Sequence, residues 1–237
     1  MSTVLLRLRE RILTGEYPVG GVLPSEMELA SAHGVSRRTV RTALATLARQ
    51  GLVESRRGAG WYVQPGQTQG FDRMRSFTQW AYSRGRVPGG RIVERTLRHP
   101  TPREARLLSI GTEAQVLCFV RVRTLDGRAV MVERSTWAPW VVAAMAEVED
   151  DVVSTTAVLA DAGIVVSSGN HRIEAVPAAT MDASLLGVRR SSPVLQVRRE
   201  TFAANGRPVE CAEDRYAPYT ISFEAQAFGS AALPGGD

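Results

Sequence analysis

The sequence contains no lysine, and all 29 of its basic side chains are arginine. A lysine is needed for a Schiff base with pyridoxal phosphate and for the Walker-type phosphate-binding loop. Both kinds of chemistry are therefore excluded. The three histidines, His33, His99 and His171, are far apart and lack the spacing of metal ligands, so we expect neither a metal nor a cofactor.

Cysteine is almost as scarce, and long apolar runs are missing. Cys118 and Cys211 lie in alternating apolar segments, which favours free thiols that are buried over a disulfide. There is no run of eighteen apolar residues and no signal-peptide pattern at the start, so we expect a cytoplasmic protein with no membrane partner. The length of 237 residues allows one large or two ordinary domains.

Charge is unevenly distributed along the chain. Residues 1–65 hold nine arginines against five acidic residues, a net charge of +4, whereas residues 66–237 hold 20 against 19, a net charge of +1. A compact basic unit is typical of a protein that binds the phosphate backbone of DNA. A basic face can also be merely solvated, so charge alone leaves both interpretations open.

Three helices are predicted in the first fifty residues. Residues 4–14 repeat apolar groups at the helical period. Ser25 and Glu28 fit a capping box at the start of a second helix, and Gly34 stands where helices commonly end. Ser36 is the expected N-cap of a third helix. Two helices joined by about three residues, one of them glycine, form the helix-turn-helix pattern.

The third helix carries Arg37, Arg38 and Arg41 in its first turns. Positive side chains there oppose the helix dipole at a cost of about a few tenths of a kcal/mol each, so a bound anion is expected to offset that cost. A recognition helix enters the major groove of DNA by its N-terminal residues. The segments LVESRR, GAG and WYV that follow predict a β-hairpin wing. The alternative is a packed helical unit with no ligand.

The segment LPSEMELASAHGVSRRTVRTALATLARQGLVESRRGAGWYV resembles the winged-helix domain of the GntR family of bacterial transcription regulators, and the resemblance covers residues 4–64. It implies contacts with operator DNA from the start of the third helix and from the wing. Met27 and Ala59 depart from the family pattern at positions that are usually basic, and Arg38 and Arg57 are expected to substitute for them. The implied DNA-binding residues are Ser36, Arg37, Arg38, Thr39, Arg41, Arg57, Gly58 and Gly60.

A polar stretch containing proline and glycine follows, which predicts a linker. We therefore divide the chain into a DNA-binding domain at 1–64, a linker at 65–70 and an effector-binding and dimerisation domain at 71–237. In the last, Asp126-Gly127 and Asn205-Gly206 predict two β-hairpins. Helices are expected near 71–84, 102–110, 139–147, 154–162 and 180–187, which makes the fold class α+β.

The two predicted hairpins are related in sequence. DGRAVMVERSTWAP (126–139) aligns without gaps with NGRPVECAEDRYAP (205–218). We infer two related hairpins in one antiparallel sheet, arranged about a pseudo-twofold axis.

Strand alternation places Arg121 and Arg123 on one face of this sheet. If the first hairpin has the three-residue loop 125–127, Glu133 joins that face, and a two-residue loop would send it to the other. The first register brings two guanidinium groups and a carboxylate together, a set suited to an anionic, hydroxylated ligand. The alternative is a surface ladder of ion pairs, which would add little to stability.

The segments RSFTQWAYSRG, FVRVRTLDGRAVMVERSTWAP, VVSTTAVLADAG and GRPVECAEDRYAP are similar to the UTRA effector domain of the HutC-type branch, which has a chorismate-lyase-like fold with an antiparallel sheet and helices. The match runs from about 71 to 225. Thr156 stands where sugar-phosphate-binding members often have tyrosine, so another small acid or an amine stays open as effector. The resemblance implies a pocket lined by Ser76, Phe77, Thr78, Arg121, Arg123, Glu133, Ser154, Glu210 and Tyr216.

Together these features predict a ligand-responsive transcription regulator. We expect a homodimeric repressor that a small anionic metabolite, such as a sugar phosphate, releases from a palindromic operator. One alternative is an enzyme of chorismate-lyase-like fold fused to a DNA-binding domain, although no histidine or activated nucleophile lies near the predicted pocket set. Another is an architectural DNA-binding protein without an effector, which the size of the second domain disfavours.

Overall fold

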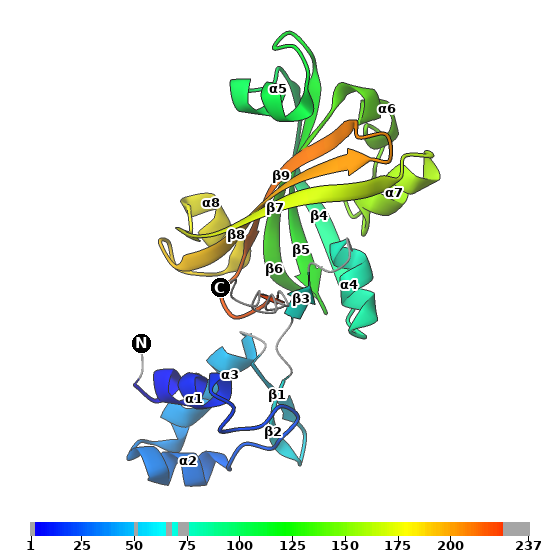
Figure 1. Ribbon diagram of the computed structural model, residues 1–237. Coiled ribbons are helices and arrows are strands. Elements are labelled where there is room, and N and C mark those ends of the chain that lie inside the picture. The colour runs from blue at the N-terminus through cyan, green and yellow to red at the C-terminus, as the bar shows by residue number, and fades with distance from the viewer. Residues whose placement is uncertain (1–2, 50–51, 65–67, 71–75, 225–237) are drawn as a thin grey trace, which may run out of the picture.

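The computed structural model describes residues 3–49, 52–64, 68–70 and 76–224. These residues form a small N-terminal helical domain and a larger domain built on a twisted sheet, which lie at opposite ends of the molecule (Figure 1). The cores of the two domains are separate. Within the described ranges, we find no helix that is both long enough and apolar enough to span a membrane.

The N-terminal domain is a winged helix-turn-helix. It consists of α1 (Thr3–Leu13), α2 (Glu26–His33), α3 (Arg37–Arg49) and a hairpin of β1 (Val53–Arg56) and β2 (Gly60–Val63). The predicted capping box is present, because the Ser25 hydroxyl accepts from the Glu28 amide at 3.2 Å and the Glu28 carboxylate accepts from the Ser25 amide at 2.7 Å. Gly34 ends α2 at φ 62°, in the left-handed region that favours glycine.

The apolar periodicity of α1 and α3 accounts for the core of this domain. Both helices turn their repeating apolar positions inward, where they are buried. This packing leaves the arginine-rich face of α3 exposed to solvent. The core residues of the two helices are Val4, Leu5, Leu8, Ile12, Val40, Ala43, Leu44 and Leu47.

The C-terminal domain is α+β, as predicted. Its antiparallel sheet has the order β4-β5-β6-β9-β8-β7. The strands are β4 (Pro88–Arg98), β5 (Val116–Leu125), β6 (Arg128–Trp137), β7 (Val166–Pro177), β8 (Pro193–Ala203) and β9 (Pro208–Tyr216). The helices are α4 (Phe77–Ser83), α5 (Pro102–Leu108), the 3-10 turn η1 (Pro139–Val141) with α6 (Val142–Met145), α7 (Thr155–Asp161) and α8 (Thr180–Leu186).

The helices of this domain lie close to their predicted ranges. The start of the first predicted helix, 71–75, falls outside the described residues, and the range 139–147 is divided between η1 and α6. β3 (Thr68–Gly70), inside the predicted linker, pairs in parallel with β10 (Ser222–Glu224) at the far end of the chain. Both cysteines are free, but only Cys211 is fully buried, since Cys118 is half-buried.

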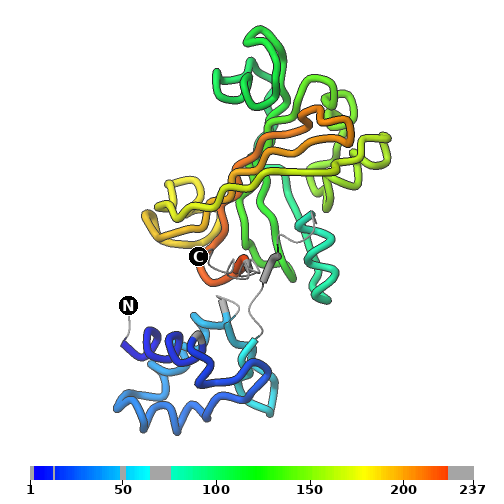
Figure 2. Tube along the Cα trace, in the orientation of Figure 1, coloured from blue at the N-terminus to red at the C-terminus, as the bar shows by residue number. Residues whose placement is uncertain are grey.

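The sheet has the predicted internal symmetry. The unit β4-α5-β5-β6 repeats as β7-α8-β8-β9 at an offset of 79 residues, from 126 to 205, so the repeat includes a strand and a helix before each hairpin. β6 and β9 pair at the centre, with Arg134 opposite Glu213. The trace in Figure 2 shows the first unit in green shades and the second from yellow to orange.

The first hairpin has the shorter of the two loops that the sequence allowed. β5 and β6 are joined by only two residues, Asp126 at φ 48° and Gly127 at φ 75°. A register shift follows, because Arg123 faces Met131 while Thr124 faces Ala129. This bulge inserts one extra residue into β6 and so returns Glu133 to the face of the arginines.

Glu104 is expected to make stability depend on pH. Burial alone would raise its pKa, but hydrogen bonds from Arg98, Thr101 and Thr136 lower that pKa to about 2. A lowered pKa in the folded state means that the contribution is complete near neutral pH and is lost as pH falls from about 4.5 toward 2. Glu104→Gln should lose about 2–3 kcal/mol of unfolding free energy at pH 7. Urea denaturation at pH 7 and pH 3 tests this, because the difference between variant and wild type must shrink at pH 3.

Candidate DNA-binding face and effector site

The start of α3 presents the predicted recognition residues to solvent. Arg37, Arg38 and Arg41 are all exposed. Glu26 at the start of α2 holds the Arg41 guanidinium in a two-pronged ion pair, with Nε–Oε1 at 3.2 Å and Nη2–Oε2 at 2.8 Å. In the part of the chain that the structure describes, Arg37 and Arg38 form no ion pair. Two of the three charges therefore remain open to an anion.

The other predicted DNA-binding residues lie at the same end of α3 or in the wing. The Ser36 hydroxyl accepts from the Thr39 amide at 3.1 Å and lies 2.9 Å from the Thr39 hydroxyl, which confirms Ser36 as the cap. Gly58 and Gly60 have φ of 75° and 96°, conformations that strain any other residue. Arg57 is exposed in the turn that these glycines form. The predicted DNA-binding residues are thus carried by two neighbouring elements.

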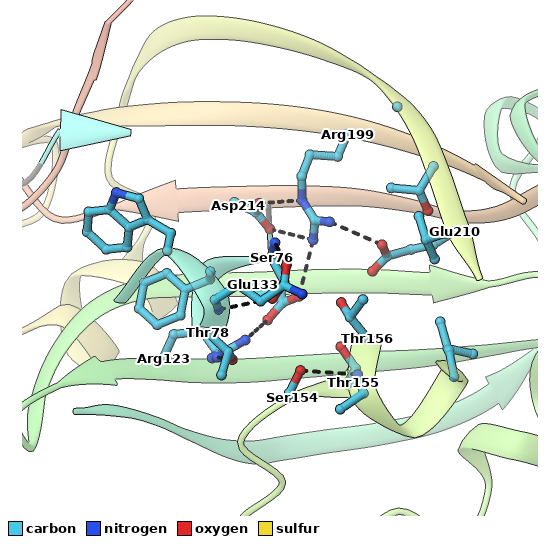
Figure 3. Close-up of a pocket in the computed structure, with 18 of the residues that line it drawn as sticks. Ser76, Thr78, Arg123, Glu133, Ser154, Thr155, Thr156, Arg199, Glu210 and Asp214 are labelled. Atoms are coloured by element: carbon cyan, nitrogen blue, oxygen red, sulfur yellow. Dashed lines mark hydrogen bonds and ion pairs between the residues drawn. The ribbon is translucent and has the colours of Figure 1, made fainter. Parts of the chain in front are cut away.

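The C-terminal domain contains a cavity of about 1390 Å³ on the face of the sheet that β5, β6, β8 and β9 share. The start of α4 and the start of α7 close over it (Figure 3). Eight of the nine predicted effector residues line this cavity, and the structure therefore brings together segments from four distant parts of the sequence. They are Ser76, Phe77, Thr78, Arg123, Glu133, Ser154, Glu210 and Tyr216.

Arg121, the ninth, lies behind the cavity wall. Its side chain is fully buried, and it donates to Glu133 at 3.1 Å and to the Val152 carbonyl at 2.6 Å. A further contact reaches the Thr155 hydroxyl at 3.5 Å. Arg121 therefore positions Glu133 and the start of α7.

Arg123 connects the sheet to the segments that close the cavity. Its guanidinium donates to the Thr78 hydroxyl at 3.0 Å, to the Val153 carbonyl at 2.8 Å and to Glu133 at 3.3 Å. The same group lies 4.5 Å from the ring centre of Phe77. Burial lowers the pKa of Arg123 to about 10, so the side chain stays charged at neutral pH. The Arg123 side chain thus connects β5 to α4, to β6 and to the segment that precedes α7.

Two residues that the sequence reasoning did not single out complete the polar centre. Arg199 contacts three carboxylates: Asp214 at 2.6 Å, Glu133 at 3.1 Å and Glu210 at 3.2 Å (Figure 3). Strand alternation in the second hairpin could have identified these two residues from the sequence. It places Glu210 and Asp214 on one face of β9, and the pairing of β8 with β9 puts Arg199 opposite Ala212, which lies between them.

The buried charges balance, with three arginines against three carboxylates. Although burial favours the neutral acid, the nearby arginines lower the pKa of Glu133 to about 2. Burial prevails at the other two carboxyl groups, where it raises the pKa of Asp214 to about 6 and also raises that of Glu210. The two carboxyl groups with raised pKa values therefore both lie on β9, whereas Glu133, with its lowered pKa, lies on β6.

Some polar atoms of the cavity wall are left without a hydrogen-bond partner among the described residues. They are Trp137 Nε1 and Thr201 Oγ1. An unmet buried polar group costs about 1–3 kcal/mol, and a ligand with both donors and acceptors would remove that cost. The described residues offer no cluster of histidine, cysteine or acidic side chains that could hold a metal ion.

Gly90 in β4 is expected to be essential for this arrangement. A Cβ atom there would lie 2.8 Å from Arg121 Nη2 and 2.9 Å from the Val152 carbonyl oxygen. Gly90→Ala should therefore cost about 1–3 kcal/mol of unfolding free energy and weaken ligand binding. Gly111→Ala is the matched control, because nothing lies within 4 Å of a Cβ at that position. Equal urea midpoints for the two variants would contradict the prediction.

Comparison with known proteins agrees with this architecture. Residues 1–63 match the gntR family of bacterial regulatory proteins, and residues 83–221 match the UTRA domain. The chain is 30% identical to the HTH-type transcriptional repressor NagR of Bacillus subtilis, over 90% of this chain and 88% of that protein. It is 31% identical to the HTH-type transcriptional regulator Rv0792c of Mycobacterium tuberculosis, over 91% of this chain and 81% of that protein.

A solved structure shares the complete architecture. PhnF from Mycobacterium smegmatis superposes with a TM-score of 0.66 at 26% sequence identity, covering 96% of this chain and all of that one. YydK from Bacillus subtilis, with a TM-score of 0.56 at 21% identity, shows the same fold over 95% of this chain and 97% of that one. The sequence likeness and the structural likeness thus extend over both domains.

Proposed function

This chain belongs to the GntR family of bacterial regulatory proteins, with a UTRA domain of the HutC type, and from that membership we propose that it represses transcription until a small anionic, hydroxylated metabolite binds its cavity. α3 and the wing would hold operator DNA in the absence of the metabolite. Binding of the metabolite would then favour a conformation with lower affinity for the operator. One relative, NagR, is named a repressor, which supports this direction of control.

The observation that carries the proposal is the buried polar centre of the cavity. Arg123 and the hydroxyl groups of Ser76, Thr78, Ser154 and Thr156 gather at one end, where a phosphate or carboxylate would find donors. The unpartnered atoms of Trp137 and Thr201 lie in the same wall and suit the hydroxyl or amine groups of a ligand. Because Arg123 is already hydrogen-bonded, an anion would share its guanidinium with Glu133 and Thr78.

Contacts between the domains offer a route from the cavity to the DNA-binding face. Tyr216 lines the cavity, and three residues later Tyr219 adopts a φ of 64°. The Tyr219 hydroxyl accepts a hydrogen bond from Arg9 of α1 at 3.1 Å, and the Arg9 guanidinium lies 4.2 Å from the ring centre. A movement of Tyr216 would therefore reach α1. A coupling of about 1–3 kcal/mol is typical of such regulators.

We further propose that the protein acts as a homodimer, because a palindromic operator matches a twofold protein. Contrary to the expectation from the sequence, one histidine, His171, lines the cavity. We nevertheless propose no catalytic activity. In the cavity, the arginines and carboxylates already neutralise each other in ion pairs, whereas a regulator needs only to bind its ligand.

The test is a gel-shift titration with the DNA upstream of the protein's own gene, followed by sugar phosphates and small carboxylic acids. We expect the protein to bind this DNA and one class of compound to release it. If DNA binds and no compound releases it, the assignment of the cavity to an anionic metabolite is wrong. Analysis of each compound after incubation tests the enzyme alternative, since any product would contradict a purely regulatory role.

A further inference from the structure

The effector cavity is larger than a small anion requires. Its volume of about 1390 Å³ exceeds the range of about 300–1000 Å³ that is common for the pocket of a drug-sized ligand. A phosphate or carboxylate held by Arg123 and the surrounding hydroxyl groups would fill only the part near the starts of α4 and α7 (Figure 3). The rest of the cavity is therefore open to a second part of the ligand.

The remaining space lies between α7 and the start of β7, and its wall is apolar. Ala157 and Ala160 stand three residues apart on one face of α7, line the cavity and are exposed. Val165, which follows the helix, also lines the cavity and is 62% exposed. Two buried residues of the domain core complete the wall, so that the apolar groove consists of Trp137, Ala157, Leu159, Ala160 and Val165.

Few charges face this apolar groove. Asp161, at the last position of α7, is the only charged residue of that helix. His171 of β7 also lines the cavity, and burial together with the charge of Arg199 lowers its pKa below the usual value, so its ring is neutral at neutral pH. An apolar surface that is exposed beside a charged site is covered most favourably by an apolar group.

We propose that the effector is an amphipathic anion, whose acidic, hydroxylated head binds at Arg123 and whose apolar arm lies along α7 in the apolar groove. This inference rests on the proposed function and narrows the ligand to acids that carry such an arm. Ser154 caps α7 at the end near the head, and Ala160 lies about 9 Å further along the helix axis. An acetyl group is too short to cover that distance, so the apolar groove selects a longer hydrocarbon chain.

A homologous series of β-hydroxy acids tests the arm. β-Hydroxybutyrate, β-hydroxyhexanoate, β-hydroxyoctanoate and β-hydroxydecanoate share one anionic, hydroxylated head and differ only in the length of the hydrocarbon chain. Titration calorimetry with the full chain should show a dissociation constant that falls about fourfold for each added methylene group, as expected when a CH₂ group is buried. An equal dissociation constant for all four acids would overturn the inference.

Filling the apolar groove tests where the arm lies. Ala160→Phe should remove the dependence on chain length, so that β-hydroxydecanoate binds no more tightly than β-hydroxybutyrate, whose own affinity stays unchanged. Ala157→Leu fills less of the groove and should reduce the dependence in the same direction. The matched control is Ala143→Phe, at an exposed alanine of α6 outside the cavity wall, which should behave as wild type. Circular dichroism confirms that each variant is folded. If Ala160→Phe and Ala157→Leu both keep the wild-type dependence, the inference is wrong.

The outcomes separate this inference from the proposed function. If sugar phosphates or short acids release operator DNA and a longer chain improves neither binding nor release, only the apolar arm is wrong. If no β-hydroxy acid binds, the inference is also wrong. The proposed function is then decided independently by the gel-shift titration, because its sugar phosphates and small acids carry no arm.

Discussion

Replacing Arg199 with methionine is expected to lower the unfolding free energy by about 3–5 kcal/mol and to abolish the response to the effector. Arg199 is the only described cation in contact with all three buried carboxylates of the cavity. Without it, Glu133, Glu210 and Asp214 would face only Arg121 and Arg123, and breaking a buried ion cluster from one side leaves an uncompensated charge. Methionine keeps most of the apolar stem, so the loss of unfolding free energy measures the contribution of the guanidinium group.

The neighbouring residue provides the control for this prediction. Arg198 points to the opposite face of the sheet, is about a third exposed and pairs with Glu174 and Glu213. Because solvent screens such pairs, Arg198→Met should cost at most about 1 kcal/mol. Urea denaturation compares the stabilities, and gel shifts with the effector compare the responses. Equal midpoints for the two variants would show that the buried cluster does not support the cavity.

The N-terminal domain could be predicted almost completely because its determinants are local. The Ser25 cap, the Gly34 end and the short turn to Ser36 lie within a few residues of the structure that they specify. The ion pair from Glu26 to Arg41 could not be predicted in this way. It joins residues fifteen positions apart, and it depends on the angle at which α2 packs against α3.

In the larger domain, the local sequence does not determine the register of the first hairpin. Asp126-Gly127 correctly predicts a turn, but the two-residue loop alone would direct Glu133 away from the arginines. The bulge in β6 corrects this, and nothing in its sequence marks it, because its position is fixed by pairing on both sides of the strand. Arg121 and Glu133 thus share a face of the sheet because of the bulge, whereas the sequence analysis allowed this only with a three-residue loop.

Only part of the cavity could be predicted, because the rest depends on strand order and tertiary packing. The residues carried by the family resemblance, from Ser76 to Tyr216, gather as expected. To predict the role of Arg199, one must know the order of the strands. Only the pairing of β6 with β9 brings β8 close enough for its arginine to reach Glu133. The position of Arg121 behind the wall also follows from tertiary packing, with Val152 and Thr155 covering its guanidinium.

Arg37→Ala and Arg41→Ala are each expected to weaken operator binding by about 1–3 kcal/mol, which corresponds to roughly 5- to 150-fold in the dissociation constant. Both side chains are exposed at the start of α3, where the helix dipole favours an anion. Effector binding should be unchanged, because the cavity lies in the other domain. Gel shifts measure the first quantity, and a thermal-shift titration with the effector measures the second.

The matched control for these variants is Arg106→Ala, an exposed arginine on α5 in the C-terminal domain that removes the same charge. If the effect comes only from net charge, the three variants will lose operator affinity equally, and the recognition-helix assignment is then wrong. The structure also predicts a difference between the two helix positions. Glu26→Gln should weaken DNA binding through Arg41, which it no longer orients, and should add nothing when Arg41 is already alanine. Arg37 forms no ion pair with Glu26 and feels its charge only at longer range, so the same substitution should add most of its effect to Arg37→Ala.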